Sequence, residues 1–144
     1  MPVTVKNISL WRKEVENKTG VLAQTLEPLA KAGADLHVVM GFRYSGDETK
    51  AAVELYPISG KKSIAAAEQV GLSASAIPTL LVEGDNKPGL GCAIAQAIAD
   101  AGVNLSFLVA QVIGRKYSAV IGFTNDEDVK KATTLIKKAT SKRK

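Results

Sequence analysis

The stretch ENKTGVLAQTLEPLAKAGADL at residues 16–36 returns in altered form as DNKPGLGCAIAQAIADAGVNL at residues 85–105. An offset of 69 residues aligns 7 identical positions out of 20, and these positions cluster at the two ends of the stretch. Similarity at a fixed spacing indicates that one structural unit is used more than once. The sequence therefore predicts two units of similar fold within a chain of 144 residues.

The identical positions lie where backbone geometry restricts the choice of residue. Gly20 and Gly89 stand where an extended run gives way to helical spacing, and Gly33 and Gly102 stand where that spacing ends. Glycine is favoured just after a helix because the left-handed conformation needed there carries no Cβ penalty. Between these glycines, apolar residues recur at helical spacing and predict one buried stripe on each helix. The predicted stripes are Leu22, Leu26, Leu29 and Gly33 in the first copy, and Leu90, Ile94, Ile98 and Ala101 in the second.

Each predicted helix is preceded by one extended run and followed by a hairpin and a second helix. The extended runs lie at residues 4–15, 34–44 and 49–57 in the first half, and at residues 73–84, 103–113 and 117–124 in the second. The second helices are predicted at residues 61–70 and 126–138. Each half therefore reads as strand, helix, strand, strand, helix, with glycine in the hairpin turn.

A complete ferredoxin-like unit needs a fourth strand, but one extended run, at residues 72–83, separates the halves. An unpaired strand edge is an aggregation liability, and a unit of about 60 residues buries only about 60% of its unfolded surface. Both arguments predict that the halves pack against each other. The predicted fold class is α+β, with two ferredoxin-like βαββαβ units in tandem and helices on one face of each antiparallel sheet. The sequence leaves open where each fourth strand comes from.

The net charge of +5 is concentrated at the C-terminal end. Five of the 19 basic residues lie in the last eight positions, which leaves 14 basic against 14 acidic groups elsewhere. No aromatic residue is interleaved with these cations, as a platform for stacking single-stranded nucleic acid requires. We expect a disordered, solubilising basic tail at residues 141–144, rather than a phosphate-binding arm, and no nucleic-acid partner.

The single cysteine, Cys92, and the single histidine, His37, restrict the chemistry of the chain. They allow no intramolecular disulfide and at most one thiolate and one imidazole for a metal, so no metal site is predicted. We expect His37 to be a partly buried structural residue on a strand and Cys92 to be a small apolar side chain in a helix. A nucleophile needs a paired base, and the sequence offers none, so no catalytic residue and no enzymatic activity are predicted.

Two glycine-containing stretches resemble nucleotide-binding motifs only superficially. The stretch GLG at residues 89–91 has Ile94 where a dinucleotide fingerprint requires its third glycine. The stretch GKKS at residues 60–63 has Leu55 where a phosphate-binding loop requires its first glycine. No cofactor is therefore predicted.

The N-terminal residues lack the apolar core of about 7 to 15 residues that a signal peptide requires, and no run of about 18 uncharged apolar residues occurs. We therefore expect a cytoplasmic protein with no membrane partner.

The two helix entrances are suited to a small anion. The first N–H groups of a helix lack intrahelical partners, and the helix dipole places about half a positive charge there. Gly20 and Gly89 have no side chain, so a carboxylate can approach the backbone closely. Asn17 and Asn86 lie three residues earlier, where an amide can donate to a carboxylate and accept from an ammonium.

Asp35 and Asn104 occupy matching positions just after the glycines that end the helices. The start of the strand that follows each helix need not contact the glycine loop before the helix in its own unit. It can instead face the corresponding loop of a neighbouring copy. The groups at both places suit a zwitterion held between copies.

The segment at residues 85–105, with its Pro-Gly, apolar helix and Gly-x-Asn ending, resembles the signature of the ACT domain, a small regulatory module that binds amino acids. Residues 16–36 are similar, but Thr19 stands where the family usually has proline. The resemblance extends over residues 5–139 and implies a stand-alone tandem ACT protein with no enzyme attached. It also implies an amino-acid site at the interface of paired units. The residues that map onto this site are Asn17, Gly20, Val21 and Asp35 in the first copy, and Asn86, Gly89, Leu90 and Asn104 in the second.

We therefore expect a non-catalytic regulatory protein with ACT-like units at residues 1–71 and 72–140. It is expected to bind a small amino acid between units, to form a homodimer, and to act on a regulated enzyme or another protein partner. The alternative is a structural, oligomerisation or partner-binding module without a ligand, because turns and caps favour the same glycines and asparagines whether or not anything binds.

Overall fold

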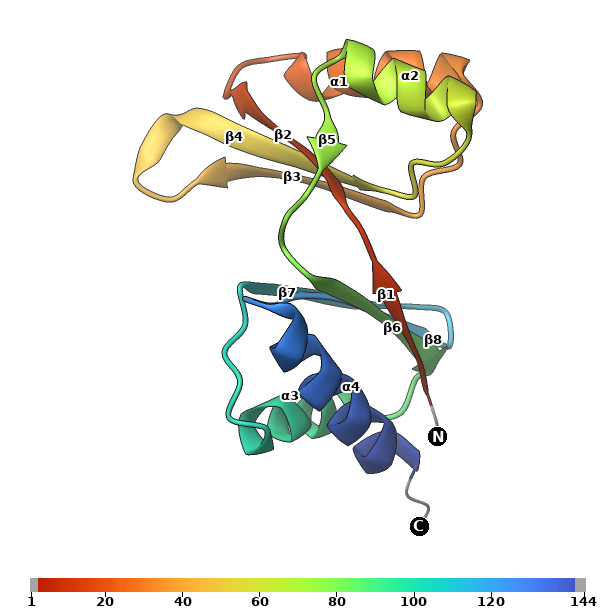
Figure 1. Cartoon of the computed structure of the whole chain (residues 1–144), viewed down its shortest axis with the longest axis vertical. Helices are drawn as coiled ribbons and strands as arrows, with labels where there is room; N and C mark the ends of the chain where they lie inside the picture. The colour runs from red at the N-terminus through yellow and green to blue at the C-terminus, as the bar shows by residue number, and fades with distance from the viewer. Residues whose placement is uncertain (1–2, 142–144) are drawn as a thin grey trace. The chain divides into compact units, whose positions relative to one another are not determined.

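A computed structural model describes residues 3–141, which form two compact units. One unit, here called the continuous unit, is Ser9–Ser75. The other, here called the split unit, combines the chain up to Ile8 with the chain from Ala76 onwards. Each unit is an antiparallel four-stranded sheet with two helices on one face (Figure 1). The predicted α+β class with two ferredoxin-like units is therefore confirmed.

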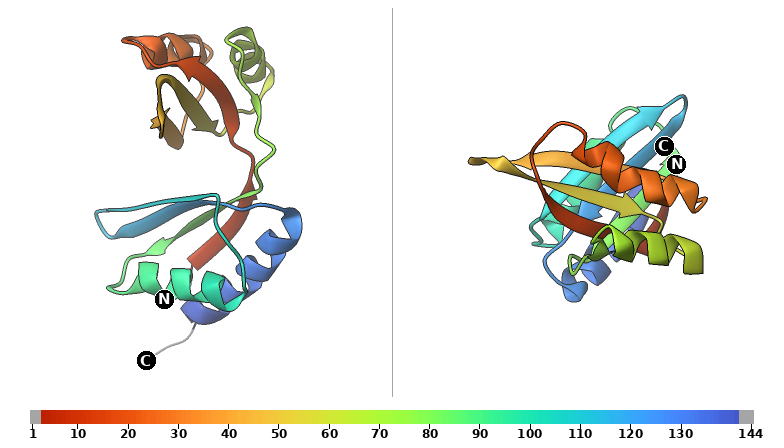
Figure 2. Two further views of the ribbon diagram at one scale, coloured as in Figure 1. Left: turned by 90° about the vertical axis from the view of Figure 1, so that its left-hand side faces the viewer. Right: turned by 90° about the horizontal axis from the view of Figure 1, so that it is seen from above.

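The continuous unit contains four strands and two helices. In chain order these are β2 (Trp11–Glu16), α1 (Val21–Lys31), β3 (Val38–Tyr44), β4 (Asp47–Tyr56), α2 (Lys61–Gln69) and β5 (Ser73–Ala74). The sheet order is β3-β4-β2-β5, so the single hairpin connection between β3 and β4 and the two helical crossovers give the ferredoxin-like arrangement. Helices α1 and α2 lie side by side over the sheet (Figure 2).

The split unit has the same arrangement with its fourth strand supplied from the N-terminal end of the chain. Its elements are β1 (Val3–Ile8), β6 (Thr79–Asp85), α3 (Leu90–Asp100), β7 (Phe107–Ile113), β8 (Lys116–Gly122) and α4 (Asp126–Ser141). The sheet order is β1-β6-β8-β7, so β1 beside β6 takes the place that β5 takes beside β2. The missing fourth strand of the second unit is therefore the beginning of the chain.

This arrangement corrects the simple boundary expected between residues 71 and 72. The extended run at residues 4–15 is too long for one strand of either sheet, and it forms β1 in the split unit and β2 in the continuous unit. The run at residues 72–83 is divided in the same way between β5 and β6. Strand β1, from the first half of the sequence, therefore belongs to the split unit. Strand β5, which lies beyond residue 71, belongs to the continuous unit.

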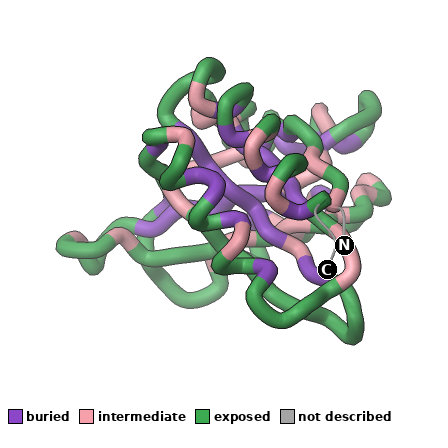
Figure 3. Tube along the Cα trace, turned by 90° about the horizontal axis from the view of Figure 1, so that it is seen from below, coloured by how far each residue is buried: buried purple, intermediate pink, exposed green. Residues whose placement is uncertain are grey.

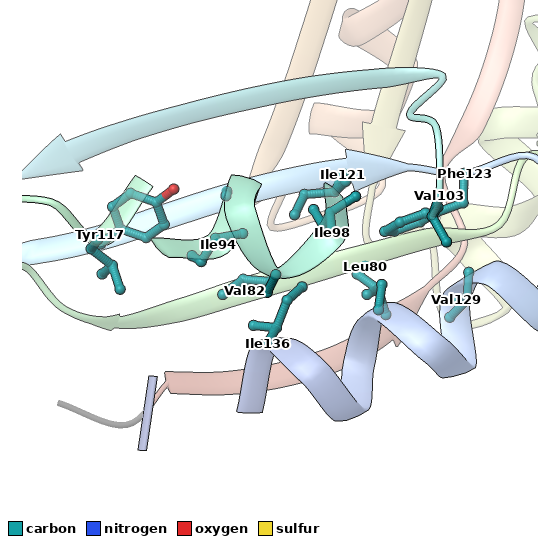
Figure 4. Packing of buried hydrophobic residues seen from close by; sticks show 14 residues of the cluster. Leu80, Val82, Ile94, Ile98, Val103, Tyr117, Ile121, Phe123, Val129 and Ile136 are labelled. Carbon is teal, nitrogen blue, oxygen red and sulfur yellow. The ribbon is translucent and has the colours of Figure 1, made fainter. Parts of the chain in front are cut away.

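The core of the split unit follows the predicted stripe of its first helix. Leu90, Ile94 and Ile98 of α3 are all buried, and they pack with residues of α4 against β6 and β8 (Figure 4). Asn125 begins α4 by accepting a hydrogen bond from the Asp128 backbone N–H at 2.8 Å through its side-chain oxygen. Acidic residues fill the first turn of α4, as expected for the positive end of a helix.

The predicted stripe on α1 is partly wrong. Leu29 is buried and Leu26 is half-buried, but Leu22 is exposed, and Thr25 is buried instead. The hydroxyl of Thr25 donates to the Val21 carbonyl at 2.9 Å, so its polar atom is satisfied within the helix and its methyl group can enter the core. Throughout the described chain, buried residues gather where helices and strands of one unit meet, and the loops are mostly exposed (Figure 3).

Ser141 is the last residue of α4, so the predicted tail starts later than expected. The rest of that prediction, residues 142–144, lies outside the described residues. None of the helices in residues 3–141 is long and apolar enough to cross a membrane.

Candidate functional site

The two predicted helix entrances have the same backbone geometry. Gly20 precedes α1 with φ 86°, and Gly89 precedes α3 with φ 87°, both in the left-handed region that favours glycine. A Cβ atom built at either glycine would have no atom within 4 Å, leaving aside its chain neighbours. Glycine is therefore required here for its backbone conformation and not by a close contact of its Cα with another part of the structure.

The asparagines before these glycines join the loop to the tip of the hairpin. The side-chain Nδ2 of Asn17 donates to the Glu48 carbonyl at 2.8 Å, and the Asn17 backbone N–H donates to the Thr49 carbonyl at 2.8 Å. In the split unit, the backbone N–H of Asn86 donates to the Arg115 carbonyl at 2.7 Å. Both asparagines thus have a structural role, and the Asn17 side-chain oxygen still has capacity to accept a hydrogen bond.

A cleft of about 490 Å³ lies at the entrance of α1 in the continuous unit. Asn17, Gly20 and Val21 line it on the side of the loop and helix. Arg43 of β3 and Ala51 of β4 line it on the side of the sheet. The structure thus brings together three of the four residues predicted for the first copy.

The fourth predicted residue of each copy lies at the far end of the helix. Asp35 follows α1, whose 11 residues separate it from Gly20 by about 16 Å along the axis. Its carboxylate is exposed and lies 3.2 Å from the His37 imidazole. Asn104 is likewise exposed in the loop between α3 and β7. Within one unit, neither residue joins the predicted site at the helix entrance.

His37 differs from its predicted role. His37 precedes β3, and 60% of its side chain is exposed, so it is not a partly buried strand residue. Cys92 lies on α3, as expected, and it is exposed. Among residues 3–141, no group of three or more His, Cys, Asp or Glu side chains is placed to hold a metal ion.

Arg43 is a site residue that the sequence reasoning missed. It pairs with Ala51 across the β3–β4 hairpin, and Ala51 packs in the core on the helix side of the sheet. Because paired residues of antiparallel strands share a face, Arg43 lies on that side as well. No described residue forms a side-chain hydrogen bond or an ion pair with Arg43. The signal available in the sequence is the register of the hairpin, which places Arg43 opposite Ala51.

The split unit differs at the equivalent positions. Val112 and Tyr117 form the hairpin pair that corresponds to Arg43 and Ala51. Tyr117 is 6% exposed and belongs to the core of the split unit, and burial raises the pKa of its phenol. Its hydroxyl lies 3.7 Å from the position of a Cβ on Gly91, in the first turn of α3. An aromatic side chain therefore fills the space below this helix entrance (Figure 4).

A polar cluster lies on the other face of the continuous unit's sheet. The Arg12 guanidinium lies 3.4 Å from the Glu54 carboxylate and donates to the Tyr44 hydroxyl at 2.8 Å. Glu54 is almost fully buried, and its Oε1 atom has no hydrogen-bond partner among the described residues. Burial raises the pKa of Glu54, against the opposing effect of Arg12. The cluster therefore holds a buried carboxylate that is incompletely hydrogen-bonded, rather than an open ligand site.

Replacement of Glu54 by Gln is expected to stabilise the protein at pH 7 by about 1 kcal/mol, because it removes a poorly compensated buried charge. A carboxyl whose folded-state pKa is raised contributes stability at low pH, and this contribution is lost as the pH rises through the folded-state pKa. The advantage of Glu54→Gln should therefore shrink as the pH falls toward the ordinary Glu value of 4.5.

Thermal unfolding of the variant and the wild type from pH 4 to pH 8 measures this effect. Glu14→Gln is the control, because Glu14 is exposed and lies on the same face of β2 as Arg12. A variant that is less stable than the wild type at pH 7 would show that the pair with Arg12 outweighs the cost of burial.

A second hollow, of about 360 Å³, lies between α3 and α4. Asp100 and Lys138 both line it, and the Gln96 side chain donates to the Asp100 carboxylate at 2.9 Å. The charges of Asp100 and Lys138 are opposite, and the Asp100 carboxylate already accepts a hydrogen bond from Gln96. This hollow is therefore a weaker candidate than the cleft at α1.

No protein-family model and no curated protein sequence matches the chain. Solved structures do match it over nearly its whole length. Protein BT0572 from Bacteroides thetaiotaomicron has a TM-score of 0.70 at 17% identity, covering 92% of this chain and 98% of that one. The ligand-free regulatory subunit of aspartate kinase from Thermus thermophilus has a TM-score of 0.65 at 16% identity, covering 96% and 97% of the two chains.

A third similar structure is the aspartate kinase of Clostridium acetobutylicum, with a TM-score of 0.61 at 15% identity. The match covers 96% of this chain but 34% of that enzyme, so the chain has the size of a part of the kinase. At these identities the likeness concerns the fold. The shared fold is two ferredoxin-like units in tandem, which supports the resemblance to the ACT domain seen in residues 16–36 and 85–105.

Proposed function

We propose that the chain is a non-catalytic regulatory protein that binds a small amino acid through its ACT-type units. The observation that carries this proposal is the open cleft at the entrance of α1, lined by Asn17, Gly20 and Val21. Its volume of about 490 Å³ lies in the range of about 300 to 1,000 Å³ that is typical of small-molecule sites. Helix N–H groups there suit the carboxylate of an amino acid, and the Asn17 oxygen suits its ammonium.

The cleft opens to solvent beside β3, and we propose that a further ACT-type unit closes it. In this arrangement Asp35 of one unit completes the site of another, and two copies of the chain form a homodimer. The equivalent residues of the second copy, as the sequence predicts them, are Asn86, Gly89, Leu90 and Asn104. Leu90 packs in the core and its backbone N–H donates to the Lys87 carbonyl at 3.1 Å, so it would shape the entrance and make no hydrogen bond to a ligand.

A regulatory role fits the similar solved structures, one of which is a regulatory subunit of aspartate kinase. We propose that the chain acts on an enzyme or another protein partner in the cytoplasm. An amino acid would then shift the equilibrium between two states of the assembly, and the size of the shift is limited by the difference in its affinity for the two states.

A screen of the twenty common amino acids by thermal unfolding tests this proposal. An amino acid at 100 times its dissociation constant is expected to stabilise the folded protein by about 2.7 kcal/mol. For a chain of this size, the melting temperature should rise by roughly 5 to 10 °C. Asp35→Ala should weaken the response without affecting stability in the absence of ligand, because 90% of the Asp35 side chain is exposed.

Glu27→Ala is the matched control, because Glu27 is an exposed acid on α1 that lines no part of the cleft. The absence of a shift with any of the twenty amino acids would contradict the proposal. An unchanged response in Asp35→Ala would remove Asp35 from the site and leave the binding itself in place.

One observation favours the alternative, a structural or partner-binding module. Strand β7 ends the sheet of the split unit, and within residues 3–141 no strand pairs with its outer edge. Its sequence FLVAQVI has no charged residue, and Val109 and Ile113 are 49% and 69% exposed. Natural edge strands usually carry charges or are covered, so this edge suits pairing with another chain. A dimer that forms in every condition, together with a negative amino-acid screen, would support this alternative.

A further inference from the structure

We infer that the first-copy cleft binds an acidic amino acid, and that Tyr117 closes the equivalent cleft of the second copy. The inference deepens the proposed function and rests on it. Each chain then holds one amino acid, beside α1, and Arg43 selects for a negatively charged side chain. Three features of the described residues lead to this assignment: the space in the cleft, its charge, and the substitutions between the two copies.

The space in the first-copy cleft exists because its floor is formed by small residues. Ala51 pairs with Val15 of β2 on one side and with Arg43 of β3 on the other. Gly41, two residues before Arg43, lies below Leu22, whose side chain is 3.7 Å from the position of a Cβ on that glycine. Leu22 therefore forms a wall of the cleft instead of filling it, which also explains why this leucine is absent from the core.

The charge in the first-copy cleft is positive. Its lining includes Lys18 and Arg43 and no carboxylate. Lys18 already lies 3.3 Å from the Glu16 carboxylate in an exposed ion pair. Arg43 has no such partner among the described residues. Every α-amino acid brings one ammonium group and one α-carboxylate, and only an acidic amino acid adds a second carboxylate. That carboxylate can pair with the exposed Arg43 guanidinium through two parallel hydrogen bonds.

The second-copy entrance lacks both features. Val112 replaces Arg43, so the cation is absent. Tyr117 replaces Ala51 at the same register, since it pairs with Gly84 of β6 as Ala51 pairs with Val15. The phenol extends below the first turn of α3, where Gly91 in place of Leu22 makes room for its hydroxyl. The change from Leu22 to Gly91 and the change from Ala51 to Tyr117 are complementary, so the second copy is packed where the first is open.

The test uses the full chain with L-glutamate, and with L-glutamine as a neutral molecule of nearly the same shape. Calorimetry should show one glutamate bound per chain, with at least tenfold weaker binding of glutamine. Amide resonances of Gly20 and Val21 should shift on addition of glutamate, and that of Gly89 should not. L-aspartate is included as the acidic amino acid with the shorter side chain.

Two variants test the assigned residues. Arg43→Gln should weaken glutamate binding at least tenfold and change glutamine binding little, whereas Arg115→Gln, the same change on the other hairpin, should leave both unchanged. Ala51→Tyr should abolish glutamate binding by copying the second-copy side chain. Because this larger residue can disturb the core, Trp11 fluorescence is used to confirm that the continuous unit remains folded.

The possible failures are distinct. Two amino acids bound per chain, or a shift at Gly89, would overturn the inference and leave the proposed function intact. The same holds if a neutral amino acid binds more tightly than glutamate and aspartate, or if Arg43→Gln has no effect on glutamate binding. If none of the twenty amino acids binds, the proposed function fails and this inference fails with it.

Discussion

Removal of the N-terminal segment through Ile8 is expected to unfold the split unit and to leave the continuous unit folded. The removed segment includes β1, which pairs with β6 along its whole length, from Val3 opposite Gly84 to Ile8 opposite Thr79. Val3 and Val5 pack against the core of the split unit, and Ile8 is 9% exposed. Burial of one such side chain contributes about 1.5 to 3 kcal/mol. The total loss of about 4 kcal/mol or more approaches the whole stability of a small domain.

The two units can be followed separately in this experiment. Trp11, the single tryptophan, packs against the core of the continuous unit, so its fluorescence reports on that unit. Methyl resonances of Ile94 and Ile121 report on the split unit. After truncation, we expect these methyl resonances to lose their dispersion while the Trp11 unfolding transition persists. A chain divided between residues 71 and 72 would give the opposite result, with the Trp11 transition lost and the methyl resonances preserved.

Single substitutions provide a matched control for the truncation. Val5→Asp places a charge on the buried side of β1 and should destabilise the split unit. Lys6→Asp introduces the same side chain at the next position, which is exposed, and should have little effect. Equal effects of the two substitutions would show that β1 does not present one face to the core.

Ile94→Ala is expected to cost about 2 to 5 kcal/mol, the range for truncation of a fully buried aliphatic side chain. Ile94 is 0% exposed and lies at the centre of the packing between α3 and the sheet (Figure 4). The equivalent position in α1 is Thr25, which is 3% exposed. Thr25→Ala should cost only about 1 kcal/mol, because its hydroxyl bonds within its own helix and leaves no other buried group unpaired.

Denaturant unfolding of the two variants measures this difference. The Trp11 transition should move in Thr25→Ala and stay in place in Ile94→Ala, whereas the isoleucine methyl resonances should show the reverse. Comparable losses in the two variants would contradict the assignment of the two helix faces, and a shift of both transitions in either variant would show that the units unfold together.

The comparison of the two helices shows how far periodicity alone can predict burial. In α3 the residues at helical spacing are aliphatic throughout, so Leu90, Ile94 and Ile98 were identified correctly. In α1 the apolar residues fit more than one face of the helix, and the spacing predicted burial of Leu22 and not of Thr25. In the structure Thr25 faces the core and Leu22 lies against Gly41, a strand residue about 20 positions away, and no local pattern encodes that contact.

The candidate site was predictable only where its residues are close together in the sequence. Asn17, Gly20 and Val21 lie next to one another in sequence, and a repeated motif with a left-handed glycine was sufficient to identify them. Arg43 and Ala51 reach the cleft only because two hairpin strands pair at a particular register.

The sequence by itself determined the duplication, the helices, the hairpins and the glycine at each helix entrance. These features depend on interactions between residues close together in the chain, so local spacing and backbone preference are sufficient to specify them. The tertiary structure alone decided which sheet receives β1, which lies more than 70 residues from its partner strand β6. It also decided that Ala51 leaves one helix entrance open and Tyr117 fills the other, because the free volume at a site is set by side chains that distant strands bring to it.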